Sequence, residues 1–109
     1  EADAWYHRPA ERLMLGNAPL IPRAELPLLG DHNVANALAA ALAVHAVAGI
    51  AVDLLGRALR TFRPLSHRLE IVREVAGVLW INDSNATNLG STEMAVAAVD
   101  RPFVLLLGL

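Results

Sequence analysis

The chain has 109 residues, of which 55% are hydrophobic and 18% are charged, and its formal net charge is −2. This composition fits a small folded unit and excludes a disordered chain, while the charge argues against nucleic acid or an anionic membrane surface as a partner. The absence of cysteine excludes disulfides and thiolate metal sites.

The first 29 residues predict loops and short strands. The segments Arg-Leu-Met-Leu at 12–15 and Leu-Ile at 20–21 flank the turn sequence Gly-Asn-Ala-Pro at 16–19, which is typical of a β-hairpin. Because Pro19 and Pro22 cannot donate a ladder hydrogen bond, we expect this hairpin at a sheet edge or with an irregular ladder.

A long helix is predicted over residues 33–47. One apolar face follows the helical spacing: Val34, Ala37, Leu38, Ala41, Leu42 and His45. Asp31 or Asn33 is expected to cap the start, and Gly49 is expected to end the helix in the left-handed conformation. His45 is expected to be a core or interface residue, since it lies on the apolar face.

A shorter helix is predicted over residues 52–60, in which Gly56 is expected to cost about 1 kcal/mol relative to alanine. Pro64 ends the helical pattern, because the residue before a proline avoids the α region. The period then changes to two, and an Ala-Gly turn between residues 69–74 and 78–81 predicts a second hairpin.

A polar loop at residues 82–88 leads into a helix predicted over residues 89–99, with Asn88 as its N-cap. The apolar run at residues 103–107 is typical of a buried strand in a parallel sheet. Strand, loop, helix and strand would together form one βαβ unit. We therefore expect an α/β fold with a domain boundary near Pro64.

Two polar clusters could contact a nucleotide. Asn33 and Asn36 are three residues apart on one helix face, so their amides could present a donor and an acceptor to a base edge such as adenine. Arg68, between His67 and Glu70, could bind phosphate or ribose oxygens. The alternatives are helix capping for the asparagines and a solvated Arg–Glu pair for the arginine.

The third polar cluster is the loop at residues 82–88, which has six polar side chains in seven positions. In an open α/β sheet, the end of a strand and the following helix N-terminus form the usual ligand crevice. Asp83 could accept hydrogen bonds from ribose hydroxyls, and Thr87 could bind a substrate carboxylate. We identify no catalytic triad and no metal-ligand spacing in the sequence.

Taken in order, these clusters resemble the Mur ligase family. The matching segments are residues 30–37, 62–70, 77–84 and 86–93. The first segment, Gly-Asp-His-Asn-Val-Ala-Asn-Ala, is similar to a motif of the whole family. The last two, which contain Ile-Asn-Asp-Ser and Ala-Thr-Asn, resemble more specifically the members that add D-glutamate. The resemblance covers essentially the whole chain.

The resemblance implies that residues 1–63, a hairpin plus helices, are the tail of a central ATP-binding domain. Residues 64–109 would open a Rossmann-like C-terminal ligase domain. The implied reaction is the ATP- and Mg²⁺-dependent addition of D-glutamate to UDP-N-acetylmuramoyl-L-alanine in cytoplasmic peptidoglycan synthesis. The ATP-binding residues would be Asn33, Asn36, Arg68 and Asp83. The substrate-binding residues would be Thr87, Ser84 and Asn85.

The chain departs from the family pattern at Asn85, where the family has lysine, so Asn85 cannot supply that positive charge. All nine basic residues are arginines, and without lysine the phosphate-binding P-loop pattern is missing. We therefore expect the chain alone to be inactive, with Mg²⁺ held mainly by parts outside it.

Two other readings stay open. One is a ligase similar to folylpolyglutamate synthetase, which the Asn-Asp-Ser-x-Ala-Thr-Asn loop argues against. The other is a non-catalytic α/β nucleotide-binding or interaction module. The apolar excess further predicts self-association, while the short apolar runs predict no membrane partner.

Overall fold

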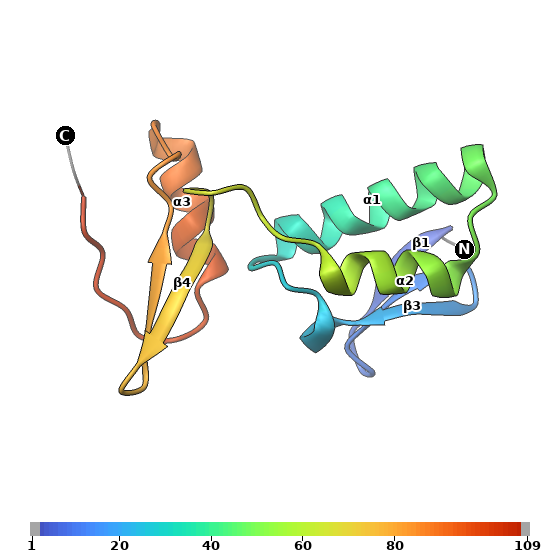
Figure 1. The fold of residues 1–109 in the computed structure, drawn as a ribbon, viewed down its shortest axis with the longest axis horizontal. Coiled ribbons are helices and arrows are strands. Elements are labelled where there is room, and N and C mark those ends of the chain that lie inside the picture. The colour runs from blue at the N-terminus through green and yellow to red at the C-terminus, as the bar shows by residue number, and fades with distance from the viewer. Residues whose placement is uncertain (1–2, 108–109) are drawn as a thin grey trace.

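The computed structural model describes residues 3–107, which form two lobes joined by an extended segment (Figure 1). The first lobe contains β1 (Ala4–His7), β2 (Arg12–Leu15), β3 (Ala18–Pro22), the short 3-10 helix η1 (Arg23–Glu25), α1 (Asp31–Ala48) and α2 (Val52–Thr61). The second contains β4 (Glu70–Val75), β5 (Val78–Asn82) and α3 (Leu89–Ala98). The radius of gyration is 15.4 Å, larger than the roughly 13 Å of a compact chain of this length, which agrees with the two-lobed shape.

The first lobe is built on an antiparallel sheet with the order β1-β2-β3. The hairpin of β2 and β3 confirms the prediction, and its ladder shifts register beside Leu13, so that Met14 lies opposite Pro19. The prolines thus produce the irregular edge ladder expected of residues without an N–H group. The sequence did not single out β1, whose Trp5 Nε1 donates to the carbonyl oxygen of Gly16 at 2.8 Å.

The hydrophobic core lies entirely in the first lobe, where α1 and α2 pack against the sheet and against each other. Its buried residues are Leu13, Leu15, Leu20, Ile21, Leu26, Val34, Ala37, Ala41 and Leu55. Three of them belong to the predicted apolar face of α1, which is therefore confirmed. Among the residues that the structure describes, none after α2 is buried.

Gly56 lets α2 approach the sheet closely. A Cβ atom added at Gly56 would lie 2.4 Å from the carbonyl oxygen of Leu20 in β3. That oxygen belongs to the backbone and cannot move away without disturbing the strand. The glycine therefore lowers helix propensity but permits the contact between α2 and β3.

The ends of α1 correct one prediction and confirm another. The N-cap is Gly30, with φ of 88°, and neither Asp31 nor Asn33 caps the helix, because both already lie in its first turn. Glycine suits this position because residues with a Cβ rarely adopt positive φ. Gly49 ends α1 in the left-handed conformation as predicted. His45 is exposed rather than part of the core, and its Nδ1 lies 2.7 Å from the carbonyl oxygen of Ile50.

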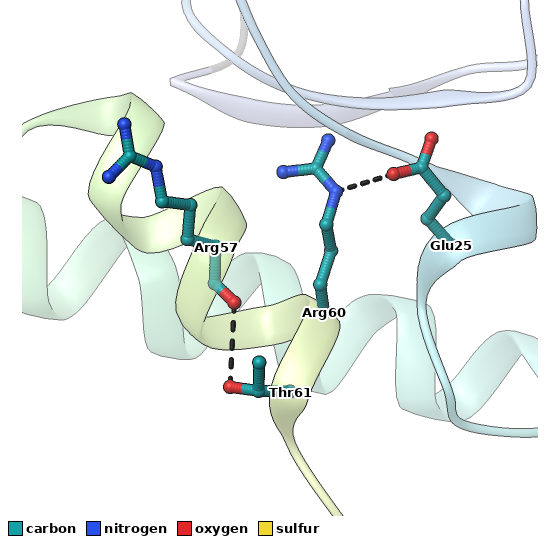
Figure 2. Close-up of polar contacts among 4 residues, drawn as sticks. All are labelled: Glu25, Arg57, Arg60 and Thr61. Carbon is teal, nitrogen blue, oxygen red and sulfur yellow. Dashed lines mark hydrogen bonds and ion pairs between the residues drawn. The ribbon is translucent and has the colours of Figure 1, made fainter.

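The end of α2 is tied to η1 by an ion pair between Arg60 and Glu25, shown in Figure 2. In the same view, the hydroxyl of Thr61 donates to the carbonyl oxygen of Arg57 at 3.5 Å. Because the Arg60–Glu25 pair is about half exposed, it fixes the path of the chain more than it stabilises the fold.

In the second lobe, β4 and β5 form the predicted hairpin. Its two turn residues, Ala76 and Gly77, have φ of 51° and 79°, the pattern of a type I′ turn that matches the strand twist. Helix α3 begins after Asn88, whose Oδ1 accepts a hydrogen bond from the Ser91 amide at 2.8 Å. The predicted N-cap of α3 is confirmed.

The predicted strand at residues 103–107 is wrong. The segment is extended but pairs with no described strand, and the side chains of Val104 and Leu106 are 86% and 79% exposed. A parallel strand needs a neighbouring strand and an apolar layer on each face, which the β4–β5 hairpin and α3 do not supply. The α/β composition is confirmed, whereas the βαβ unit does not form. Within residues 3–107, no helix is both long and apolar enough to cross a membrane.

Candidate functional site

The structure brings together two of the three polar clusters, in two loops of the second lobe. We call residues 65–70 the Arg68 loop and residues 82–88 the Asp83 loop. The amide of Asn85 donates to the carbonyl oxygen of His67 at 2.8 Å, and the amide of Leu69 donates to Asp83 Oδ1 at 2.9 Å. These contacts join segments that are 14 to 18 residues apart in the sequence.

The backbone of the Arg68 loop is held in an unusual conformation. His67 and Leu69, on either side of Arg68, have φ of 66° and 46°. Histidine is tolerated in this region, but a leucine there is uncommon. Such a conformation persists only where the surrounding structure enforces it, and it is enriched at ligand sites.

Three successive amides enforce the conformation of the Arg68 loop. The His67 amide donates to Glu70 Oε1 at 3.1 Å, and the Arg68 amide donates to the carbonyl oxygen of Leu65 at 3.2 Å. The Leu69 amide donates to Asp83, as described above. The Arg68 side chain is exposed and makes no ion pair with any residue in 3–107. The Arg–Glu pair considered from the sequence therefore does not form, and the guanidinium is open to a ligand.

Asp83 is partly buried and directly follows β5. Its Oδ1 fixes the Arg68 loop, and its carbonyl oxygen accepts from the Ala86 amide at 2.9 Å. Its other carboxylate oxygen, Oδ2, accepts no hydrogen bond from the described part of the chain. One oxygen thus has a structural role, while the other can accept a hydrogen bond from a ligand.

The start of α3 presents the remaining predicted residues. Ser84, Asn85 and Thr87 are exposed, and the Thr87 hydroxyl lies one residue before the cap formed by Asn88. The backbone amides and dipole of a helix N-terminus favour an anion at this place. Without the lysine of the family pattern, the neutral amide of Asn85 adds no charge there.

Asn33 and Asn36 lie on the other lobe, in the first turns of α1. Their side chains share one face as predicted, since Asn36 Nδ2 lies 3.4 Å from Asn33 Oδ1. Asn33 Nδ2 donates to the carbonyl oxygen of Leu29 at 2.8 Å, so much of the hydrogen-bonding capacity of Asn33 is used within the protein. Asn36 is exposed and keeps its carbonyl oxygen for a ligand.

An open cleft of about 800 Å³ separates the two lobes, between the segment before α1 and the end of α3. Its lining includes Leu29, His32, Met94 and Ala98, but none of the predicted site residues. The candidate site is therefore the pair of loops. Within residues 3–107, no group of three potential ligands could hold a metal ion.

The sequence did not single out Asn82 and His67 as partners. Asn82 Nδ2 lies 2.8 Å from His67 Nδ1, and Asn82 Oδ1 accepts from the Ser84 amide at 3.0 Å. An asparagine directly after a buried-type strand and before an acidic residue was a signal available in the sequence. Its partner could not be predicted, because the left-handed conformation of His67 brings the ring to Asn82.

No protein-family model matches the chain. It is 51% identical to a UDP-N-acetylmuramoylalanine--D-glutamate ligase of Sodalis glossinidius, in an alignment covering 81% of the chain and 20% of that ligase. It is 41% identical to the ligase of the same name from Haemophilus influenzae strain 86-028NP, covering 98% of the chain and 25% of the relative. For the Acidobacterium capsulatum ligase the identity is 43%, with coverage of 83% and 19%. The chain thus spans a fifth to a quarter of the length of these relatives, and the resemblance found in its motifs is confirmed.

Proposed function

Because the chain is homologous to a segment of the UDP-N-acetylmuramoylalanine--D-glutamate ligases, we propose that it serves as the corresponding segment of such a ligase. The whole protein would use ATP to join D-glutamate to UDP-N-acetylmuramoyl-L-alanine in peptidoglycan synthesis. The observation that carries the proposal is the linkage of the Arg68 loop to the Asp83 loop. It leaves a guanidinium and a carboxylate oxygen open on the same pair of loops.

These groups suit a nucleotide. The guanidinium of Arg68 has the donor geometry for phosphate oxygens, and Asp83 Oδ2 can accept a hydrogen bond from a ribose hydroxyl. Asn36, supported by Asn33, is proposed to approach the adenine from the other lobe. In phosphoryl transfer, such contacts position the nucleotide and offset the charge that develops on the moving phosphate.

The start of α3 suits the amino-acid substrate. Thr87 and Ser84 are proposed to donate hydroxyl hydrogen bonds to a carboxylate of D-glutamate beside the helix N-terminus. Asn85 could add an amide hydrogen bond but no charge. The described residues do not fit a Mg²⁺ site, because Asp83 is the only carboxylate on the Asp83 loop and no cluster of three ligands exists within residues 3–107.

We further propose that residues 1–63 close an ATP-binding domain and that residues 64–109 begin a Rossmann-like one. The distribution of burial supports this division, since the core ends at Leu55 and an extended segment follows α2. A cytoplasmic location is proposed from the resemblance. Because the chain lacks lysine, and therefore a P-loop, we propose that it does not cleave ATP by itself.

The nucleotide part of this proposal is tested by calorimetric titration of the chain with ATP–Mg²⁺. We expect binding, and we expect Arg68→Ala to weaken it roughly 10- to 100-fold, since hydrogen bonds to charged groups contribute about 1.5–3 kcal/mol. Arg101→Ala is the matched control, because Arg101 is an exposed arginine of the same lobe whose salt-bridge partner is Glu74. An equal loss of ATP affinity in both variants, or no loss in either, would count against a phosphate contact at Arg68.

The substrate part is tested separately, by titration with D-glutamate. Thr87→Ala is expected to reduce the affinity several-fold, because the carboxylate loses one hydrogen bond of about 1 kcal/mol. Thr61→Ala serves as the control, since within residues 3–107 the Thr61 hydroxyl bonds only to the backbone of α2. Unchanged D-glutamate binding in Thr87→Ala would remove Thr87 from the site.

Self-association is a separate expectation. Several large apolar side chains of the second lobe are at least 48% exposed: Ile71, Val72, Trp80, Leu89, Met94 and Phe103 are examples. Exposed large apolar side chains favour pairing with another surface. In size-exclusion chromatography we expect the elution volume to shift towards larger species as the concentration rises. A concentration-independent monomer would contradict this expectation.

A further inference from the structure

Asn82 uses both ends of its side-chain amide. It is the last residue of β5, and its Oδ1 accepts a hydrogen bond from the Ser84 amide at 3.0 Å. This contact fixes the orientation of the amide, because the Ser84 N–H can donate to Oδ1 but not to Nδ2. The Nδ2 group is therefore the one that faces His67 Nδ1, at 2.8 Å.

This orientation also fixes the proton on His67. An amide Nδ2 can only donate, so His67 Nδ1 must be the acceptor. In this contact the ring proton is carried on Nε2. The two residues thus form a directional contact between the end of β5 and the Arg68 loop, and we call this hydrogen bond the Asn82–His67 latch.

The latch acts at one of the two residues of the Arg68 loop that have positive φ. His67 has φ of 66°, its amide donates to Glu70, and its carbonyl oxygen accepts from Asn85. The latch adds the imidazole ring to these backbone contacts. Because both the ring and the backbone of His67 are held, the backbone of the next residue has a fixed position. This position sets the point from which the Arg68 side chain extends.

We propose that Asn82 is a positioning residue for nucleotide binding, which holds the Arg68 guanidinium in place through His67. This inference rests on the proposed function, and Asn82 itself need not touch the nucleotide. A long arginine side chain on a loose loop loses more conformational freedom when it binds than one on a fixed loop. Removing the latch should therefore weaken ATP binding while the guanidinium is still present.

The latch itself is tested by nitrogen NMR of the His67 ring. The unsubstituted chain should show an unprotonated Nδ1 and a protonated Nε2. In Asn82→Ala this preference should be lost, while Asn82→Asp should draw the proton to Nδ1, because a carboxylate can only accept. A residue that merely supported the fold would not control the position of this proton. A protonated Nδ1 in the unsubstituted chain, or the same tautomer in all three proteins, would overturn the proposal.

The consequence is tested by titration of the same proteins with ATP–Mg²⁺. Asn82→Ala should weaken binding about fivefold, the factor that corresponds to one hydrogen bond. Asn17→Ala, in the exposed turn before β3, should leave it unchanged. The positioning role would be overturned if an Asn82→Ala chain remained folded and lost the Nε2-protonated tautomer of His67, yet bound ATP with unchanged affinity. If the unsubstituted chain binds no ATP, the proposed function fails and the positioning role with it, even where the spectra show the latch.

Discussion

Replacing Leu13 by alanine is expected to lower the free energy of unfolding of the first lobe by about 2–5 kcal/mol, the range for truncating a buried leucine. Leu13 lies in the central strand of the sheet and is fully buried, with no exposed surface. The loss combines removed apolar contact with the cavity that is left, because a packed core collapses only partly into it. In a small lobe this is a large share of the total stability.

Thermal or urea unfolding followed by far-ultraviolet circular dichroism measures this loss, since α1 and α2 provide most of the helical signal. Leu65→Ala is the matched control, because the Leu65 side chain is 68% exposed and lies outside the core. The control should change stability by less than about 0.5 kcal/mol. Similar midpoints for the two variants would mean that the core does not lie where the structure places it.

Gly56→Ala is expected to destabilise the chain by about 1–3 kcal/mol, the usual cost of overpacking. Helix propensity alone predicts the opposite, a gain of about 1 kcal/mol. The structural reason is the 2.4 Å approach of the added Cβ to the carbonyl oxygen of Leu20, which would force α2 away from β3. The sign of the change in the free energy of unfolding therefore shows whether helix propensity or packing dominates at Gly56.

The same unfolding experiment measures the effect of Gly56→Ala, with Ala58→Gly as its control in the same helix. Ala58 is exposed, so its replacement should show only the propensity cost of about 1 kcal/mol. If Gly56→Ala raised the unfolding midpoint, the close packing of α2 on β3 would be contradicted.

Local features of the fold could be predicted wherever one residue type has one physical role. Gly49 ends α1, Asn88 caps α3, and the Ala-Gly turn closes the second hairpin. In each case a short stretch of sequence contains both the residue and the conformation that it favours. The Gly56 contact could not be predicted, because the Leu20 oxygen that it accommodates lies on a distant strand.

The strand predicted at residues 103–107 failed for a related reason. Its composition correctly indicates a segment suited to burial, but burial depends on partners, and no strand within residues 3–107 pairs with it. The N-cap of α1 failed because three residues near its start could each cap a helix. Only the positive φ of Gly30 distinguishes the actual cap.

For the candidate site, the sequence identified residue types but not their arrangement. Arg68 and Asp83 were predicted as separate contacts to one nucleotide. The structure adds that Asp83 also holds the amide next to Arg68. That dual use depends on the left-handed conformation of Leu69, an unusual state for leucine that sequence patterns do not predict.

We propose above that this chain supplies nucleotide and D-glutamate contacts to a ligase. This proposal is tested most directly by placing the chain in the Haemophilus influenzae ligase, in exchange for the matching segment, and measuring ATP-dependent addition of D-glutamate. We predict that the chimera is active. Asn85→Lys, which restores the positive charge, should raise its activity, and Arg68→Ala should strongly reduce its activity. A folded chimera without activity, with or without Asn85→Lys, would contradict the proposal.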